Sequence, residues 1–202
     1  MLDDILYESE KEDLSDFRTF LRHDIFQWKI NRVKEEARQL VLKQVQFLAQ
    51  SGWGALAYPT VFGGKDDLET YASVFEHLVY VDGSLAVKFG VQFGLFGGSI
   101  QNLGNAEQRK KYLTDTGTTK LLGCFAMTET GHGSNVRGIN TTATYVHEER
   151  TIVIHTPGKN DNKEYIGNAL DAKMATVFAQ LLVNGKNQVA HAILVPLRDE
   201  KH

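Results

Sequence analysis

The sequence predicts an α+β protein with a helical first part, residues 1–120, and a small antiparallel, barrel-like β domain, residues 121–202. Two observations support this division. Apolar residues recur about every 3.6 positions up to Lys120, as in amphipathic helices, and about every second position beyond it, as in half-buried strands. The composition over 202 residues, 42% hydrophobic and 23% charged, is that of an ordinary globular protein.

Helical spacing appears first between residues 14 and 50, in two stripes. The first consists of Leu14, Phe17, Leu21, Ile25 and Trp28, and the second of Ile30, Val33, Ala37, Leu40, Val41, Val45 and Leu48. Gly52 can adopt the left-handed conformation that ends the second helix. Leu68–Val81 is the next predicted helix, with Asp66 or Asp67 as its cap. Ser84 is the predicted cap of the helix after it, and Ala106–Leu113 completes the first part as a charged surface helix.

The stretch "SLAVKFGVQFGLFGGSIQNLG" places five glycines among apolar residues. In a helix each glycine costs up to about 1 kcal/mol relative to alanine. Close approach of another backbone, of a packed helix or of a flat ligand would offset that cost, and the sequence does not choose between them. Residues 90–98 are also the predicted site of an apolar face that a further domain would cover.

Five runs beyond Lys120 are rich in β-forming residues: "LLGCFAM", "TTATYV", "TIVIHT", "ATVFAQLLV" and "VAHAILVPL". Several of them alternate apolar and polar residues, which is typical of strands with one buried face. The residues "VHEER" between the second and third runs predict a hairpin connection. The chain ends on a polar "RDEKH" directly after a strand, so we expect it to be part of a longer protein.

Charge and motif content exclude several classes of function. The formal net charge of −3 offers no large positive field for nucleic acid. No apolar run reaches the roughly 18 residues of a membrane span. The acidic start, Met1-Leu2-Asp3-Asp4, lacks the basic and apolar regions of a signal peptide, so we expect none here. The single cysteine, Cys124, fits a reducing compartment, either the cytoplasm or an organelle that imports folded proteins. Neither His-Glu-x-x-His nor Cys-x-x-Cys occurs, so no metal site is expected.

The stretch "CFAMTETGHGSNVRGINTTATY", residues 124–145, carries the most chemistry. It is not a dinucleotide fingerprint, because Val136 occupies the third glycine position, and it lacks the Gly-x-Ser-x-Gly of a nucleophile elbow. The stretch therefore predicts a strand that ends in a loop. Glycines give this loop conformational freedom, and it offers hydroxyl and backbone N–H donors. Such a loop suits the imide edge and pyrophosphate of a flavin, but taken alone it favours a simple capped β-turn.

Wider context comes from a resemblance. The segments "GLFGGSIQNLG", "GCFAMTETGHGSN", "TTATY", "IHTP", "KEYIGNA", "VFAQLLV" and "ILVPLRD", between residues 94 and 199, resemble the acyl-CoA oxidase and dehydrogenase superfamily in order and spacing, and most of all its oxidase branch. The resemblance implies a helical N-terminal domain, a middle β domain, and a C-terminal helical domain that is absent from these residues. It also implies FAD as cofactor, fatty acyl-CoA as substrate and O2 as electron acceptor.

The resemblance assigns roles to individual residues. Thr128 contacts the flavin pyrimidine edge, while Gly133 and Ser134 lie at the pyrophosphate, with Ser134 also near the acyl-CoA. Tyr165 and Ile166 cover the flavin ring, and the backbone of Gly167 packs against it. On the strand that leads into the loop, Phe125 and Met127 complete the expected cofactor contacts.

Some positions depart from the family pattern. The loop reads Gly-His-Gly-Ser-Asn where dehydrogenases commonly have Gly-x-Gly-Ser-Asp, and Gly167 replaces a Thr or Ser, so a contact to flavin N5 has to come from backbone N–H. Glu164-Tyr165 replaces the Trp pair of many oxidases, so one aromatic ring, that of Tyr165, remains at this place to stack on the flavin.

In this family a carboxylate removes the α-proton of the thioester while the β-hydrogen leaves as hydride to the flavin. The resemblance places that base in the C-terminal domain and makes Glu129 part of the loop, so no catalytic residue is expected here. Alternatives left open are a dehydrogenase that uses an electron-transfer flavoprotein and a non-catalytic flavin or acyl-CoA binding module. The full-length protein is expected to form a homodimer or higher homo-oligomer, in the cytoplasm or, in a eukaryote, in the peroxisome.

Overall fold

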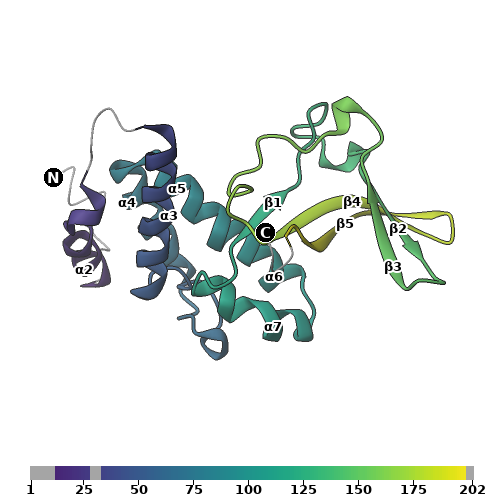
Figure 1. The fold of residues 1–202 in the computed structure, drawn as a ribbon. Coiled ribbons are helices and arrows are strands. Elements are labelled where there is room, and N and C mark those ends of the chain that lie inside the picture. The colour runs from purple at the N-terminus through teal and green to yellow at the C-terminus, as the bar shows by residue number, and fades with distance from the viewer. Residues whose placement is uncertain (1–11, 28–32, 199–202) are drawn as a thin grey trace.

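The computed structural model of the chain describes residues 12–27 and 33–198. Helices occupy one end of the molecule and a sheet the other (Figure 1). The helices are α2 (Glu12–Phe20), α3 (Lys34–Gln50), α4 (Leu68–Val81), α5 (Gly83–Phe89), α6 (Gly98–Leu103) and α7 (Ala106–Gly117). The strands are β1 (Gly123–Ala126), β2 (Thr142–Val146), β3 (Thr151–His155), β4 (Met174–Val183) and β5 (Lys186–Pro196). This order confirms the predicted fold class.

The first predicted stripe forms two short elements instead of one helix. Helix α2 ends at Phe20, and a 3-10 turn follows at Asp24–Phe26, where the His23 imidazole accepts a hydrogen bond from Ile25 N. Phe17 and Phe26 are buried in the core formed by α2, α3, α4 and α5. Trp28 and Ile30, which the sequence assigned to the two stripes, lie outside the described residues.

The caps of the later helices follow the sequence with one correction. Asp67 caps α4 by accepting from Thr70 N at 2.8 Å, as expected. Helix α5 is capped by Asp82, which accepts from Ser84 N at 2.7 Å, so the prediction of Ser84 as the cap was wrong. The carboxylate of Asp82 reaches the free N–H groups of the first turn better than a hydroxyl already inside that turn.

The glycine-rich stretch is one continuous helical rod in which Gly90–Gly97 is a π-helix between α5 and α6. A Cβ at Gly90 would lie 2.7 Å from the Phe75 ring, one at Gly94 2.5 Å from Tyr71 Oη, and one at Gly97 would overlap Tyr58 Oη. Close helix packing therefore accounts for these glycines. The segment is not the exposed apolar face expected from sequence, because between residues 90 and 98 only Gly94 and Leu95 are exposed.

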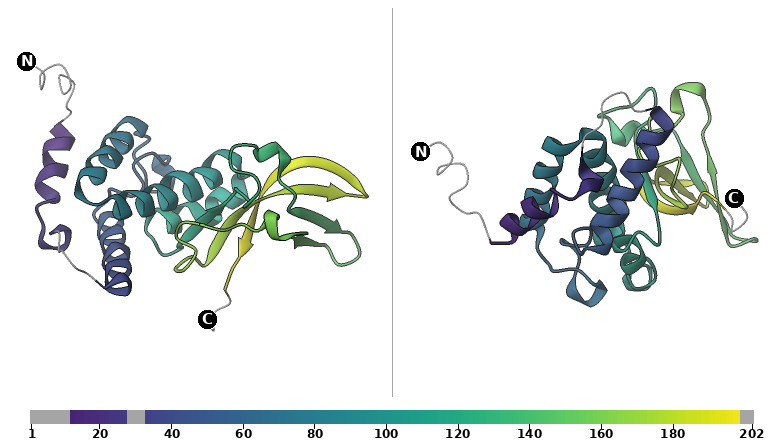
Figure 2. Two further views of the ribbon diagram at one scale, coloured as in Figure 1. Left: turned by 90° about the horizontal axis from the view of Figure 1, so that it is seen from above. Right: turned by 60° about the vertical axis from the view of Figure 1, so that its left-hand side comes forward.

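The sheet is mixed, which corrects the prediction of a purely antiparallel one. Hairpins β2–β3 and β4–β5 are antiparallel, and residues 147–150 connect the first of them, as expected from sequence. Strands β1 and β2 both pair in parallel with β4, at its start and its end respectively. Because β5 occupies the other edge of β4, β1 and β2 lie one after the other along a single edge (Figures 1 and 2).

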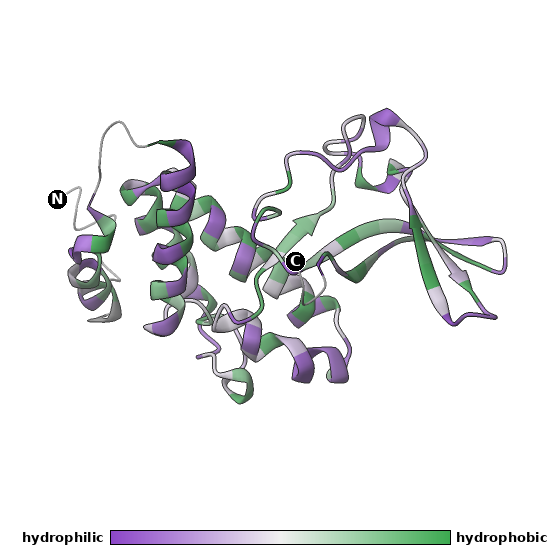
Figure 3. Cartoon of the chain, in the orientation of Figure 1, coloured by the Kyte–Doolittle hydropathy of each residue, from purple (hydrophilic) through white to green (hydrophobic). Residues whose placement is uncertain are grey.

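The helical part and the sheet share a buried junction. Phe96, Ile100 and Leu113 pack with Tyr58 and with Met174 of β4. Along β4 the residues are predominantly hydrophobic, while much of α7 is hydrophilic (Figure 3). Two buried polar contacts also cross the junction: Ser99 Oγ lies 2.7 Å from Thr176 Oγ1, and Gln92 Oε1 accepts from Gly123 N at 2.9 Å. These contacts fix where β1 starts, and so where the loop after it lies.

Candidate functional site

The loop that the sequence singled out joins β1 to β2. It leaves the sheet at Ala126, which is paired with Val177, and returns at Thr142, which is paired with Gln180. The two ends therefore lie only three residues apart along β4, although fifteen residues, 127–141, separate them in the chain. Residues in a loop of this kind can be presented to a ligand, because the rigid strand β4 holds both ends.

Glu129 anchors the loop from inside. Its carboxylate is buried and accepts Asn140 N at 2.8 Å through Oε2 and Thr141 N at 2.8 Å through Oε1. Lys163 Nζ lies 3.4 Å from Oε1. Burial raises the pKa of the carboxyl, but the hydrogen bonds from Thr141 and Asn140 and the charge of Lys163 outweigh it, so this pKa lies below its ordinary value of 4.5.

A second segment, residues 158–163, closes against the loop. Asn162 O accepts from Thr130 N at 3.0 Å, and Asn160 O accepts from Gly131 N at 2.6 Å. Asp161 Oδ1 accepts from Asn140 Nδ2 at 2.8 Å. The two segments thus form one hydrogen-bonded unit, although about thirty residues of chain separate them.

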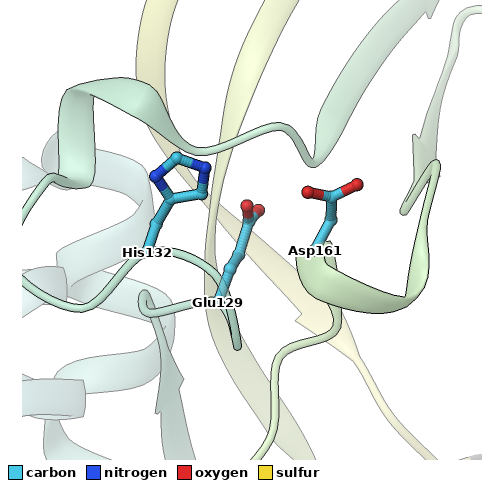
Figure 4. Close-up of side chains that lie close together, drawn as sticks. All are labelled: Glu129, His132 and Asp161. Atoms are coloured by element: carbon cyan, nitrogen blue, oxygen red, sulfur yellow. The ribbon is translucent and has the colours of Figure 1, made fainter.

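Glu129, His132 and Asp161 come within 4.8 Å of one another and offer the ligand types of a metal site. The Glu129 carboxylate lies between the His132 ring and the Asp161 carboxylate (Figure 4). Both oxygens of Glu129 and Oδ1 of Asp161 already accept hydrogen bonds from N–H groups, and the Lys163 charge lies beside Glu129. These bonds account for the positions of the two carboxylates, Glu129 and Asp161, without a metal ion.

The outer side of the loop carries donors that the described residues leave unused. Thr128, Gly133 and Ser134 are exposed. Within residues 12–27 and 33–198, neither the Thr128 nor the Ser134 hydroxyl is hydrogen-bonded, and the backbone N–H groups of Gly133, Ser134 and Asn135 have no partner either. A run of free N–H groups with two hydroxyls is a donor set for oxygen-rich or anionic ligands.

Two further residues expected to contact the cofactor lie where the loop leaves β1. Phe125, on β1, packs on the Phe178 ring with centroids 5.0 Å apart. Met127 begins the loop, and its carbonyl accepts from Lys163 Nζ at 2.9 Å. Both residues are half-buried, so they shape the base of the loop and leave Thr128 as its exposed donor.

Tyr165, Ile166 and Gly167 form a second exposed segment. Tyr165 is 99% exposed and has a φ of 56°, a left-handed conformation that non-glycine residues seldom adopt. A Cβ at Gly167 would lie 3.0 Å from Val91 Cγ2 of the π-helix. Asn168 holds the segment against β1 and α5, because its Nδ2 donates to Gly123 O and to Lys88 O at 3.3 Å each. The Tyr165 ring is therefore presented to the outside.

Sequence reasoning missed Lys163, Asp161 and Asn140, which hold the loop in place. Their partners lie 11 to 36 residues away in the chain, and an isolated Lys, Asp or Asn in a polar stretch has no signal of its own. Within the motif, Glu129 was the available hint, because a buried carboxylate needs a partner from elsewhere in the chain.

Comparison with known proteins places this architecture in a family. The model for the N-terminal domain of acyl-CoA dehydrogenases matches residues 8–120, and the model for the middle domain of the same proteins matches residues 124–201. The chain belongs to the acyl-CoA dehydrogenase family. This confirms the resemblance seen in the motifs. No helix within the described part of this family member is long and apolar enough to cross a bilayer.

Its similar relatives are named acyl-CoA oxidases. The mouse acyl-coenzyme A oxidase-like protein is 50% identical over 125 residues, 62% of this chain and 20% of the mouse protein. Peroxisomal acyl-coenzyme A oxidase 2 of Arabidopsis thaliana is 38% identical over 199 residues, 95% of this chain and 28% of the relative. The crystal structure of acyl-CoA oxidase 3 from Yarrowia lipolytica superposes with a TM-score of 0.80 at 30% identity and covers 98% of this chain. The chain therefore spans less than a third of the length of these relatives.

Proposed function

We propose that these residues form the N-terminal and middle domains of an FAD-dependent acyl-CoA oxidase, with the boundary near residue 120. The proposed reaction is the α,β-dehydrogenation of a fatty acyl-CoA to a trans-2-enoyl-CoA, with O2 as the final electron acceptor. The observation that carries it is the β1–β2 loop, which Glu129 holds from inside while Thr128 and Ser134 offer free hydroxyls outside. Support also comes from the relatives, which are named acyl-CoA oxidases.

The donor set of the loop fits FAD. Thr128 would donate to the pyrimidine edge, and the free N–H groups around Gly133 and Ser134 would hold the pyrophosphate, with the Ser134 hydroxyl also within reach of the acyl-CoA. Tyr165 and Ile166 would lie over the ring, with the backbone of Gly167 against it, and Phe125 and Met127 would support the loop. Bound FAD would supply the hydride acceptor.

The role of these residues is to bind and orient the cofactor. A general base has to be free to reach the proton it removes. The Glu129 carboxylate is not free, because it is buried and already holds Asn140 N, Thr141 N and Lys163. We therefore assign Glu129 a structural role and expect the base of the reaction to come from outside residues 1–202.

Two measurements test the proposal on the purified full-length protein. Absorption bands of oxidised flavin should be present and should bleach when a fatty acyl-CoA is added without oxygen. Readmitted oxygen should restore the bands and form hydrogen peroxide in proportion to the enoyl-CoA produced. Flavin that bleaches but is reoxidised only by an electron-transfer flavoprotein would indicate the dehydrogenase alternative, and flavin that never bleaches would indicate a binding module.

Further parts of the proposal concern partners and location. We infer a homodimer or higher homo-oligomer that acts on small molecules and not on nucleic acid, in line with the net charge of −3. In a eukaryotic source we place it in the peroxisome, which appears in the name of the Arabidopsis thaliana relative, and otherwise in the cytoplasm.

A further inference from the structure

Lys163 is a buried lysine that contacts the loop at two points. Its side chain is only 10% exposed, and the carboxylate that it faces, Glu129, is fully buried. The ammonium group donates to Met127 O at 2.9 Å and to Glu129 Oε1 at 3.4 Å. One side chain therefore reaches the residues immediately before and after Thr128.

A lysine in this environment is costly, because removing an ammonium group from water is unfavourable unless its partners compensate. Burial lowers the pKa of Lys163, and the Glu129 carboxylate offsets this only in part. The fold could satisfy Glu129 with the two backbone N–H groups that it already holds. The additional buried charge thus calls for a role beyond closing the loop.

The position of Lys163 in the chain indicates that role. It lies two residues before Tyr165, in the segment that carries Tyr165, Ile166 and Gly167. Its ammonium group is bonded to the other segment proposed to face the cofactor, at Met127 and Glu129. Lys163 therefore joins the residues on either side of Thr128 to the segment that carries Tyr165, in addition to the hydrogen bonds that residues 160–162 make with the loop.

We propose that Lys163 is a positioning residue for FAD, which sets the distance between the Thr128 donor and the Tyr165–Gly167 segment. The inference rests on the proposed function. Without the ammonium group the Met127 carbonyl loses its partner and the buried Glu129 loses its countercharge. The hydrogen bonds that remain, from Thr130, Gly131 and Asn140 to residues 160–162, lie farther along the chain from Thr128 and Tyr165. Thr128 and Tyr165 are then less firmly fixed relative to one another, and FAD binds more weakly.

The experiment uses the full-length protein, stripped of flavin and titrated with FAD. Lys163→Met removes the charge and keeps the length, Lys163→Arg keeps charge and donors, and Lys159→Met alters an exposed lysine four residues earlier in the chain. Flavin fluorescence quenching gives each FAD dissociation constant, and thermal unfolding of the flavin-free proteins reports their folding. We expect Lys163→Met to weaken FAD binding by roughly tenfold or more, and Lys163→Arg and Lys159→Met to stay within about threefold of the parent.

The outcomes separate the inference from the proposed function. A parent protein that does not bind FAD contradicts the proposed function, and the inference with it. A parent that binds FAD while Lys163→Met binds equally well overturns the inference alone, as does a Lys163→Arg variant as weak as Lys163→Met. Should Lys163→Met not fold, Lys163→Gln takes its place, since it keeps a donor for Met127 O and lacks the charge. The same tenfold loss is expected of it, and parent-like binding would overturn the inference.

Discussion

At the scale of single residues, two neighbouring residues of the loop differ in their exposure to solvent. Thr128 is exposed and its hydroxyl has no partner among residues 12–27 and 33–198, whereas Glu129 is buried and accepts hydrogen bonds at both carboxylate oxygens. Adjacent side chains of an extended segment point to opposite sides, so one residue can hold the loop while its neighbour faces a ligand. The two residues should therefore respond differently to substitution.

Thr128→Val removes the exposed donor and keeps the shape of the side chain. An imide edge that loses its donor loses roughly 1–3 kcal/mol, so the variant should bind FAD about tenfold more weakly. Thr128→Ser, which keeps the hydroxyl, should bind as the parent does. Both are measured by FAD content after dialysis of the full-length protein, and equal retention by the valine variant would contradict the assignment of Thr128.

Glu129→Gln should change the stability and its dependence on pH. Since the folded-state pKa of Glu129 lies below 4.5, its contribution is complete above that pH and is lost as the pH falls through the lowered pKa. The variant leaves a buried N–H facing an amide group, so at about pH 7 we expect a loss of roughly 1–3 kcal/mol. The gap between parent and variant in thermal or denaturant unfolding should narrow as the pH falls below 4.5. A gap that is constant from about pH 7 to about pH 3 would mean that the pKa of Glu129 is the same in the folded and the unfolded protein, and would contradict its lowering by the fold.

At the scale of elements, glycine in the helical rod serves packing at some positions and not at others. Gly97 and Gly98 are neighbours in helical conformation. A Cβ at Gly97 would overlap Tyr58 Oη, whose hydroxyl donates to Phe93 O at 2.9 Å, whereas one at Gly98 would be 4.0 Å from its nearest neighbour, Asn102 Nδ2. The two positions form a matched pair.

Gly97→Ala should destabilise the protein by roughly 1–3 kcal/mol, because it overpacks the junction and displaces Tyr58. Gly98→Ala should be neutral or stabilise it by up to about 1 kcal/mol, since alanine is the better helix former. Denaturant unfolding of both variants measures the difference. Equal changes in the free energy of unfolding at the two positions would show that Tyr58 can shift to make room for the added methyl group at position 97.

Strand β4 organises the other elements of the sheet. It pairs with β5 along one edge and with β1 and β2 in turn along the other. This arrangement brings both ends of the loop to neighbouring points of one strand.

At the scale of the whole molecule, we propose that the described residues supply a binding surface for the cofactor, without the base of the reaction. Residues 1–202 mixed with FAD and a fatty acyl-CoA should show no flavin reduction, because the carboxylate of the loop, Glu129, is buried and occupied. Absorbance at the flavin band measures this, with chemical reduction of the same sample as the control. Bleaching by the acyl-CoA would show that a base lies within these residues.

The sequence by itself determined the order of helices and strands, the hairpin at residues 147–150 and the family. These depend on local patterns: periodicity, turn residues, and the motifs around Thr128 and Ser134. The eight residues assigned to the cofactor come from the same motifs, and they stay predictions. Helix ends were less predictable, as the cap at Asp82 shows, because two neighbouring polar residues can compete for the same N–H groups.

Only the tertiary structure decided how the strands pair and what holds the loop. Alternation of apolar and polar residues is the same in parallel and antiparallel strands, so the parallel pairing of β1 and β2 with β4 has no local signal. The contact between Glu129 and Lys163 joins residues 34 apart in the chain. A buried ion pair forms when folding brings two distant segments together and removes water from both charges. The sequence of either segment alone therefore does not predict the pair.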